Sequence, residues 1–457
     1  MDKEMIDQMV TKAHVAQKAF EALPDAVNLA CLQAMAKCVF YGAERWARMA
    51  VDETGMGVYE HKVIKKQGKS RILWDSVRRA KAYGVLRRDE ENGIIEIAKP
   101  SGVVCAVTPC TNPVVTPLCN AMFALKTRNA IIIAPHPRGK NCAGQLVHEW
   151  NKELAKLGAP ENLIQVLAEP STELGGYLMS RSDVVIATGG MGMVKAAYSS
   201  GKPSYGVGAG NVQCIVDRNI DLSIAVGKMI EGRIFDNGII CSGEQTVIAH
   251  EDDYAEVIMA MQKKGALYVD DPAVLQRLRS VLWDEKGVFS RYAVGQSVKK
   301  IGEMAGLSVK PEHVVIVAKA EGRGAEDLLC KEKMCPVMAA FSYKTFEEAV
   351  SIAQANLEME GAGHSAAIHS FNDEHILYAG ERLTVSRFLV NQVSSKMVGG
   401  SFHNGLAPTT TLGCGTWGNN SVSENVTFKH LMNITRVSYC LPDRVVPTDA
   451  ELWGEFK

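Results

Sequence analysis

The sequence has no long hydrophobic run, no excess of either charge, and no low-complexity tract or short repeat. No apolar stretch approaches the ~20 residues of a membrane-spanning helix, so we expect no membrane partner. The 50 Lys and Arg residues almost equal the 51 Asp and Glu residues, and no basic stripe stands out, which argues against nucleic acid as a partner. Hydrophobic residues make up 47% of the chain, a composition typical of a globular protein with a large buried core.

The sequence also lacks paired cysteines. Its twelve cysteines are scattered, with no Cys-x-x-Cys pair and no Cys/His cluster at zinc-finger spacing, so we expect no metal site. The first residues do not form a basic segment followed by an apolar stretch, so we expect no export signal. Scattered free thiols fit a reducing compartment, and we therefore predict a cytoplasmic protein.

The length and the first 100 residues predict several packed units. The chain of 457 residues is about three times the length of a ~150-residue domain. Residues 1–84 carry apolar side chains at spacings of three and four, which predicts helices. Asn92-Gly93 then separates two strand-like segments within 86–99, which predicts a two-residue hairpin turn. This arm could pair with another chain.

Short β-branched runs alternate with helical stretches after residue 100. Because these runs are apolar without polar alternation, they predict parallel sheets that are covered on both faces. The first series of expected strands is 103–107, 130–134, 163–167 and 184–187. The second series is 212–216, 247–249, 314–317, 337–341 and 366–369, in a unit that extends to about residue 401. The last 50 residues predict loops and a closing strand over 433–437. The expected fold is α/β, with two doubly wound parallel-sheet domains and a β-hairpin arm.

Two loops that follow expected strands could hold a phosphate. His136, Arg138 and Lys140 follow the second strand and place cations at its carboxyl end, the usual ligand edge of a doubly wound sheet. Thr188-Gly189-Gly190 precedes a helix, and its small residues would let backbone N–H groups approach an anion. Each loop also has an ordinary structural interpretation, a solvated basic loop in the first case and a tight turn in the second.

Cys241 has the most distinctive surroundings of the thiols. A helix capped by Asp221 is expected to stop at Asn237-Gly238, and Cys241 lies in the connector before the next strand. A thiol there would be accessible, although most cysteines serve as small buried hydrophobic residues. His364 precedes a strand and could accept a thiol proton near neutral pH, but such histidines are more often structural. Glu332 is by default a solvated charge on a loop.

Five strings give a more specific indication. They are Glu53-Thr54-Gly55-Met56, Thr108-Pro109-Cys110-Thr111-Asn112-Pro113, Thr188-Gly189-Gly190, Phe235-Asp236-Asn237-Gly238-Ile239-Ile240-Cys241 and Glu332-Lys333-Met334-Cys335-Pro336. In these strings and their order the chain resembles the aldehyde dehydrogenase superfamily over nearly its whole length. Residues 198–212, 236–245 and 411–425 are similar in particular to its CoA-acylating branch, and within that branch to the CoA-dependent succinate-semialdehyde dehydrogenases.

The resemblance implies a division of the chain and a cofactor site. Residues 1–85 and 100–211 would form a nucleotide-binding domain and 212–415 a catalytic domain. Residues 86–99 and 420–445 would form the oligomerisation arm of a homodimer or a dimer of dimers. The residues that match the cofactor site are Thr108, Pro109, Cys110, Thr111, His136, Arg138, Thr188, Gly189, Gly190, Gly208, Ala209 and Glu332, the last on the nicotinamide ribose.

The resemblance also implies the chemistry. Cys241 matches the nucleophile that forms an enzyme thioester, and Asn112 matches the amide that stabilises the oxyanion together with the backbone N–H of Cys241. Hydrolytic members carry a Glu that activates water, but the matching positions here are Gly206-Val207-Gly208-Ala209. Without this base the thioester should wait for the thiol of CoA, which ionises far more easily than water. His364 is the candidate for deprotonating CoA or assisting Cys241.

The expected reaction is the reversible reduction of succinyl-CoA to succinate semialdehyde and CoA with NADPH or NADH. NADP is favoured because no acidic residue follows the second strand and the cations there could accept its 2′-phosphate, although they could equally accept the 3′-phosphate of CoA. A distal carboxylate needs a cation or several donors. The candidates for that role are Lys69, Ser242, His403 and Asn404.

Three alternatives stay open at this point. Acetyl-CoA or another short acyl-CoA could be the substrate in the same branch. A hydrolytic aldehyde dehydrogenase would form free acid without CoA. A nucleotide-binding or scaffold protein could have kept the fold and lost the chemistry, but the retention of Cys241, Asn112 and Glu332 argues against it.

Overall fold

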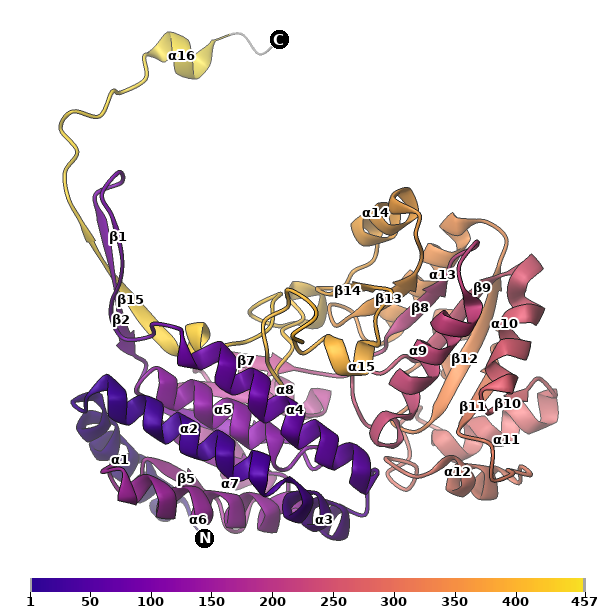
Figure 1. Ribbon diagram of the computed structural model, residues 1–457, viewed down its shortest axis with the longest axis horizontal. Coiled ribbons are helices and arrows are strands. Elements are labelled where there is room, and N and C mark those ends of the chain that lie inside the picture. The colour runs from indigo at the N-terminus through magenta and orange to yellow at the C-terminus, as the bar shows by residue number, and fades with distance from the viewer. Residues whose placement is uncertain (1, 455–457) are drawn as a thin grey trace.

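Two parallel β-sheets and one small antiparallel sheet organise the molecule (Figure 1). The computed structural model describes residues 2–454. A five-stranded sheet belongs to the first half of the chain and a seven-stranded sheet to the second half. The strands of both sheets pair in parallel, as their continuous apolar sequences predict. The predicted fold class is confirmed.

Four helices precede the first strand, as the apolar spacing in residues 1–84 predicts. They are α1 (Lys3–Glu21), α2 (Asp25–Tyr41), α3 (Ala43–Thr54) and α4 (Tyr59–Arg78). α4 packs against α2, α3 and α5 (Val115–Lys126), and its buried face carries Lys62, Lys65 and Lys66. No single helix within residues 2–454 is long and apolar enough to cross a membrane. Within this range only α2 and α3 taken together have that length and apolarity, and they are bent by 69° relative to each other.

The five-stranded sheet has the order β5-β4-β3-β6-β7. Its strands are β3 (Val103–Thr108), β4 (Ala130–Pro135), β5 (Ile164–Val166), β6 (Val184–Thr188) and β7 (Ser204–Val207). The helices that follow α5 in this unit are α6 (Lys140–Lys156), α7 (Thr172–Arg181) and α8 (Met191–Tyr198). Every residue of β3 and β4 is buried, because helices cover both faces of the sheet.

The seven-stranded sheet has the order β10-β11-β12-β9-β8-β13-β14. Its strands are β8 (Gln213–Val216), β9 (Thr246–His250), β10 (Ala266–Val269), β11 (Val315–Lys319), β12 (Val337–Tyr343), β13 (Ala366–His369) and β14 (Phe388–Val390). Its helices are α9 (Leu222–Ile234), α10 (Glu251–Lys263), α11 (Pro272–Leu282), α12 (Val298–Ala305), α13 (Phe346–Met359), α14 (Asp373–Arg382) and α15 (Ser394–Met397). The predicted cap is present, because the Asp221 side chain accepts a hydrogen bond from the N–H of Ile224.

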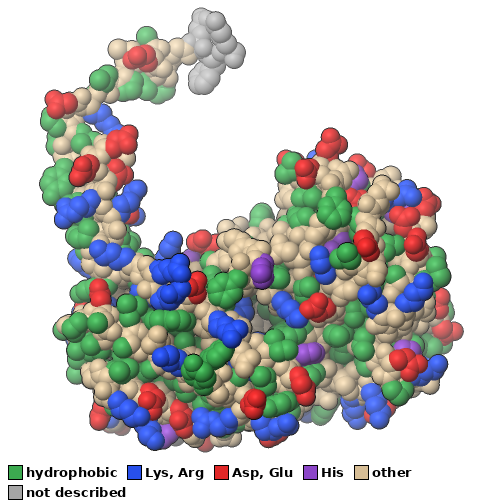
Figure 2. Space-filling model, viewed as in Figure 1, with side chains coloured by type: hydrophobic (Ala, Val, Ile, Leu, Met, Phe, Trp, Pro, Cys, Tyr) green, Lys and Arg blue, Asp and Glu red, His purple; other side chains and the backbone are tan. Residues whose placement is uncertain are grey.

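The antiparallel sheet forms an arm that stands away from the body (Figure 1). It contains β1 (Gly84–Asp89), β2 (Ile94–Pro100) and the expected closing strand β15 (Met432–Ser438), and α16 (Asp449–Trp453) lies beyond it. The hairpin is confirmed, but its turn has four residues rather than two, because Asp89 pairs with Ile94. The Asp89 side chain accepts the N–H of Asn92 (3.0 Å), which supports the longer turn. Figure 2 shows acidic and basic side chains interspersed over the body and the arm.

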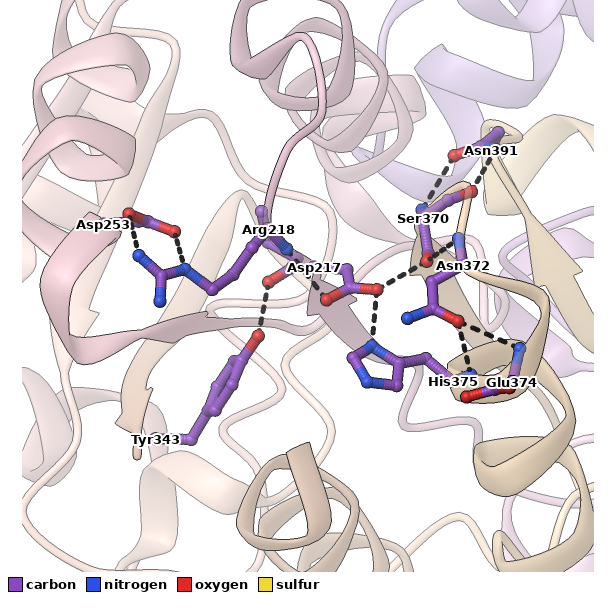
Figure 3. Close-up of polar contacts among 10 residues, drawn as sticks. Asp217, Arg218, Asp253, Tyr343, Ser370, Asn372, Glu374, His375 and Asn391 are labelled. Carbon is purple, nitrogen blue, oxygen red and sulfur yellow. Dashed lines mark hydrogen bonds and ion pairs between the residues drawn. The ribbon is translucent and has the colours of Figure 1, made fainter. Parts of the chain in front are cut away.

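Polar contacts close the carboxyl edge of the seven-stranded sheet (Figure 3). The carboxylate of Asp217, just after β8, accepts a hydrogen bond from Ser370 Oγ (2.6 Å) and contacts His375 Nδ1 (2.8 Å). Asn391, just after β14, donates to the carbonyl of Ser370 (2.7 Å). The imidazole of His375 stacks on Phe346 with ring centroids 3.9 Å apart. These polar groups are hydrogen-bond partners of one another. The connector that contains Cys241, the predicted nucleophile, precedes β9 and therefore lies at the opposite edge of the sheet.

Candidate active site

A cavity of about 1070 Å³ receives residues from both parallel-sheet units, and most of the predicted site residues line it. Those in its wall are Lys69, Thr108, Pro109, Cys110, Thr111, Asn112, His136, Arg138, Thr188, Gly189, Gly190, Gly208, Ala209, Cys241, Ser242 and Glu332. His364, His403 and Asn404 are not part of the wall. Residues that are far apart in sequence therefore meet around one space large enough for a nucleotide and a second substrate.

A sharp bend places Cys241 in this wall. The chain leaves α9 through a single turn in which Asp236 and Asn237 adopt φ angles of 54° and 53°. Left-handed backbone is unfavourable for residues other than glycine, so the surroundings must hold it. The loop that precedes β8 packs directly against Cys241, the predicted nucleophile, since a Cβ atom at Gly210 would lie 2.0 Å from the carbonyl oxygen of Cys241.

A buried ion pair with α4 holds the bend. The Asp236 carboxylate contacts the Nζ atoms of Lys62 (3.0 Å) and Lys65 (2.7 Å) and accepts the N–H of Val58 (2.9 Å). Burial raises the pKa of this carboxyl, but the two ammonium groups outweigh burial and hold it at about 2. Asp236 is thus ionised at neutral pH, and it fastens the nucleophile connector to a helix of the first unit.

The pKa of the Cys241 thiol is raised to about 12, chiefly by burial, so the thiol is protonated at neutral pH. A charge on Glu332 or Cys414 acts in the same direction, and the guanidinium of Arg387 acts in the opposite direction. The thiolate is the nucleophilic form of cysteine. Reaction at Cys241 therefore requires a proton acceptor and a positive field that favours the charged sulfur.

Asn112 lies in the cavity wall four residues after the end of β3. Its backbone carbonyl accepts the N–H of Thr116 (3.4 Å) at the start of α5. Within the described chain no hydrogen bond engages its side-chain amide, which leaves two N–H donors for a ligand. Such a donor can stabilise an oxygen that becomes negative during reaction.

The first unit presents groups that fit a nucleotide phosphate. α8 begins after Gly190, which serves as N-cap without a side-chain hydrogen bond. A Cβ atom at Gly190 would meet no atom within 4 Å, so the space beside the first turn of α8 is open. Backbone N–H groups at such a helix start attract anions. Thr108 adds a buried hydroxyl that has no partner among residues 2–454.

The cations after β4 differ in availability. Lys140 pairs with Glu169 (2.5 Å). The Nδ1 atom of His136 accepts the N–H of Arg138 (3.0 Å), and burial together with the charge of Arg138 lowers the pKa of His136. Arg138 is exposed and uses one N–H for the carbonyl of Thr54 (2.6 Å). Arg138 is therefore the cation of this loop that can still bind a phosphate in two-point fashion.

Glu332 is the one acidic residue in the described wall of the cavity. Its Oε1 accepts the N–H of Gly210 (3.1 Å). Burial raises the pKa of this carboxyl to about 8, and the charge of Glu360 adds to the increase. A carboxyl that is largely protonated at neutral pH can both donate and accept, as contact with ribose hydroxyls requires.

Comparison with known proteins assigns this arrangement to a family. Residues 1–406 match the model of the aldehyde dehydrogenase family. The chain belongs to the aldehyde dehydrogenase family. It is 51% identical over 449 residues to the succinate-semialdehyde dehydrogenase (acetylating) of Clostridium kluyveri, covering 98% of this chain and 99% of that protein.

Solved structures agree with this assignment. An acetylating aldehyde dehydrogenase from Geobacillus thermoglucosidasius superposes with a TM-score of 0.93 at 34% identity, with 98% of each chain covered. The propionaldehyde dehydrogenase of Rhodopseudomonas palustris with bound propionyl-CoA superposes with a TM-score of 0.85 at 28% identity, covering 95% of this chain and 94% of that one. The resemblance inferred from the sequence is thereby confirmed.

In this aldehyde dehydrogenase the position that matches the water-activating Glu of hydrolytic members is Gly206. A Cβ atom at Gly206 would lie 2.8 Å from Cγ1 of Val194 and 3.1 Å from Cε2 of Tyr198. A carboxylate side chain there would therefore require these side chains to move. The same segment contributes Val207, Gly208 and Ala209 to the cavity wall, and none of these residues can act as a base.

Lys69 is well placed to meet an anion, whereas two of the other substrate candidates are not. Its Nζ lies 2.8 Å from the carbonyl of Gly399, and burial lowers its pKa to about 8. Ser242 is buried in the wall beside the nucleophile. His403 is exposed, and Asn404 uses its amide for Gln392 Oε1 and the carbonyl of Met397.

His364 lies behind Cys241 and is fully buried. Its Nδ1 is 2.8 Å from Ser365 Oγ, and its Nε2 has no partner among the described residues. Its Cε1 is 3.1 Å from where a Cβ atom of Gly210 would lie, and Gly210 itself abuts Cys241. Burial lowers its pKa to about 3, so the imidazole is neutral and its role as a base stays a prediction.

Several functional candidates were not evident from the sequence. Asp236 and its partners Lys62 and Lys65 are separated by more than 170 residues. The lysines of α4 do recur at spacings of three and four, but a charged helical stripe ordinarily indicates a solvated face. The other missed residue is Arg387, whose guanidinium is buried among backbone carbonyls near the nucleophile.

Proposed function

We propose that this aldehyde dehydrogenase catalyses the reversible reduction of succinyl-CoA to succinate semialdehyde and CoA with NADPH or NADH. The observation that carries the proposal is the ammonium group of Lys69, which lines the same cavity as the thiol of Cys241. Similarity to the acetylating succinate-semialdehyde dehydrogenase of Clostridium kluyveri supports the same substrate.

The charge of the cavity wall favours anionic substrates. Its cationic side chains outnumber its single acid and are Lys65, Lys69, Arg71, Arg138, Arg291 and Lys396. Lys65 is paired with Asp236 and Lys396 with Glu231. Lys69 has only a backbone carbonyl as partner in the described chain, so two of its three N–H donors are free for a carboxylate. We propose that Lys69 binds the distal carboxylate of the succinyl group.

Cys241 provides the covalent attachment point in this mechanism. Its thiolate attacks the carbonyl carbon of the acyl-CoA, and Asn112 Nδ2 and the backbone N–H of Cys241 hold the resulting oxyanion. The bond from carbon to the sulfur of CoA then breaks, CoA leaves as a thiolate and takes up a proton, and the acyl group stays on Cys241 as a thioester. When bound, the nicotinamide supplies the hydride that reduces this thioester to the aldehyde, and it accepts the hydride in the reverse direction.

The surroundings of Cys241 protect the thioester from water. Val194 and Tyr198 fill the space that a side chain at Gly206 would need, and Glu332 is held by Gly210 and largely protonated. In the reverse direction the thiol of CoA is therefore the nucleophile that releases the acyl group. We propose that the neutral imidazole of His364 accepts the thiol proton during attack.

The division of labour in the chain follows from the same proposal. Residues 1–85 and 100–211 bind the nucleotide, 212–415 supply the nucleophile, and 86–99 with 420–445 assemble a homodimer or a dimer of dimers. Arg138 after β4 supports a preference for NADP through its free N–H groups, which suit a 2′-phosphate.

The test compares two acyl-CoA substrates in two variants. We expect kcat/KM for succinyl-CoA to exceed that for acetyl-CoA in the unmodified enzyme. Lys69→Met should lower the succinyl-CoA value about 100-fold, since losing one partner of a buried charge pair costs roughly 3 kcal/mol, and should leave the acetyl-CoA value within a few fold. Arg71→Met is the matched control, because Arg71 is also a cation of α4 in the wall but lies over the ring of Phe40.

Two outcomes would contradict the proposal. A preference of the unmodified enzyme for acetyl-CoA would favour the short-chain alternative. Rapid formation of free acid from succinate semialdehyde and NADP⁺ without CoA would indicate a hydrolytic enzyme. Mass spectrometry of the enzyme incubated with succinyl-CoA alone should locate a succinyl group on the peptide that contains Cys241.

A further inference from the structure

Arg387 is a buried cation with an unusual set of partners. Arg387 is 3% exposed and directly precedes β14. Nε and Nη2 donate to the carbonyl of His364 (3.0 and 2.7 Å), Nη2 also to the carbonyl of Gly363 (3.1 Å), and Nη1 to Oδ1 of Asn425 (3.3 Å). All of these acceptors are neutral. No carboxylate in residues 2–454 forms an ion pair with this guanidinium.

Neutral acceptors do not explain why a charge is buried here. Removing a cation from water costs several kcal/mol unless an anion compensates. An uncharged amide could satisfy part of the same carbonyl groups at a smaller cost in solvation. The charge of Arg387 is therefore uncompensated within the described residues, and an anion that forms beside it would be stabilised.

Two thiols are the groups near Arg387 that can become negatively charged. Cys414 and Cys241 are the groups whose anionic forms would raise the pKa of this guanidinium. The packing that joins Arg387 to the nucleophile is tight. Arg387 fixes the carbonyl of His364, the His364 ring abuts Gly210, and Gly210 abuts the carbonyl of Cys241.

The groups around Cys241 differ in whether they favour or disfavour a negative charge on its sulfur. Burial disfavours an anionic sulfur at Cys241, and Glu332 and Cys414 would disfavour it in their charged forms. His364 is neutral because burial lowers its pKa. Arg387 is the fixed cation whose field favours the anion. The sulfur of Cys241 thus supplies a negative charge only when it is deprotonated, during attack and again when the aldehyde leaves.

We propose that Arg387 is a positioning residue whose buried charge is the counter-ion of the Cys241 thiolate. It keeps its own N–H protons throughout, while the thiol proton passes to a base. It also orients His364 through the carbonyl of that residue. The inference rests on the assignment of Cys241 as nucleophile in the proposed function, and it extends that function by naming the group that makes the nucleophile available.

The test is the pH profile of alkylation of Cys241 by iodoacetamide in the enzyme without substrates, followed by mass spectrometry of the peptide that contains Cys241. Arg387→Gln keeps a hydrogen-bonding amide but removes the charge. We expect its profile to move upward by about one pH unit or more, which is the usual effect of one nearby opposite charge. Arg387→Lys keeps a charge but loses the planar fork. We expect its pH profile to stay close to that of the unmodified enzyme. Cys414→Ala is the matched control, since it alters the same cluster without removing a cation, and its profile should not move upward.

A purely structural role predicts a different pattern. Arg387→Gln and Arg387→Lys would then change the rate to similar extents, and that result would overturn the proposal. If Arg387→Gln does not fold, Asn425→Asp provides the same test, because it leaves the guanidinium in place and puts a carboxylate against it. Its profile should also move upward, and an unmoved profile would contradict the proposal. Loss of CoA-dependent turnover in Cys241→Ala is measured separately, so that misassignment of the nucleophile can be distinguished from misassignment of Arg387.

Discussion

Asn112 allows the oxyanion assignment to be tested with a single substitution. Asn112→Ala should lower kcat about 100-fold, corresponding to roughly 3 kcal/mol of lost transition-state stabilisation, with little change in KM. Steady-state kinetics with succinyl-CoA and NADPH measure this. Thr111→Ser, at the neighbouring position of the same wall, should stay close to the unmodified enzyme. A fall in kcat/KM that comes only from KM would argue that Asn112 binds substrate and does not stabilise the oxyanion.

Glu244 links the active-site connector to pH-dependent stability. Its Oε1 accepts the N–H of Ser394 (2.6 Å), its Oε2 has no partner in the described chain, and burial raises its pKa to about 8. The folded protein therefore keeps a proton that the unfolded chain releases near pH 4.5, and unfolding becomes more favourable as pH rises between these values.

Replacing this carboxyl tests the sign of that effect. Glu244→Gln keeps the shape and cannot ionise, so the decrease in unfolding free energy between pH 5 and pH 8 should be smaller than in the unmodified protein by a few kcal/mol at most. Urea unfolding at several pH values measures it. Equal slopes in the two proteins would contradict the assignment of a protonated Glu244.

At the scale of elements, the contact between α4 and the nucleophile connector should dominate local stability. Asp236→Ala would leave Lys62 and Lys65 as uncompensated buried charges and should cost about 3–5 kcal/mol of unfolding free energy. Asp75→Ala is the matched control, because Asp75 pairs with Arg78 on the exposed side of the same helix, where such a pair contributes at most about 1 kcal/mol. Similar losses in the two variants would show that the buried pair is not important.

A helix or strand could be predicted from the sequence where the residues that stabilise it lie close together in the chain. β3 and β4 are evident from sequence because residues 103–107 and 130–135 are all apolar, and α9 because Asp221 is a nearby cap. β7, β10 and β14 were not predicted. They have four residues or fewer, and β7 lies in a glycine-rich run typical of a loop.

The residues of the candidate site also differ in whether local sequence or remote partners define them. Cys241, Asn112 and Glu332 stand in strings whose order is specific, so the sequence predicted that they belong together. Asp236 stands in one of these strings as well, but neither its role nor that of Arg387 could be identified in that way. Their roles depend on burial and on partners from remote segments, such as the 171 residues that separate Asp236 from Lys65, and local patterns contain no such information.

At the scale of the whole molecule, the arm allows the proposed assembly to be tested. Thr435→Pro removes the N–H of a central residue in β15, where Thr435 pairs with Ile97 of β2, and proline cannot donate to a sheet ladder. We expect a monomer by light scattering coupled to size-exclusion chromatography, with both parallel-sheet units still folded. Thr435→Ala retains the N–H and should assemble normally. An unchanged mass for Thr435→Pro would argue that other surfaces hold the subunits together.

The attachment of Asp236 to α4 has a consequence for recombining this chain with its relatives. The thiol of Cys241 belongs by sequence to the second unit, but the bend that precedes it is held by lysines of the first. A hybrid that takes its first unit from one parent and its second from another would inherit the carboxylate and the two ammonium groups from different ancestors. Crossovers should therefore keep residues 59–78 and 235–245 from the same parent, and hybrids that separate them should fold yet present a misdirected thiol.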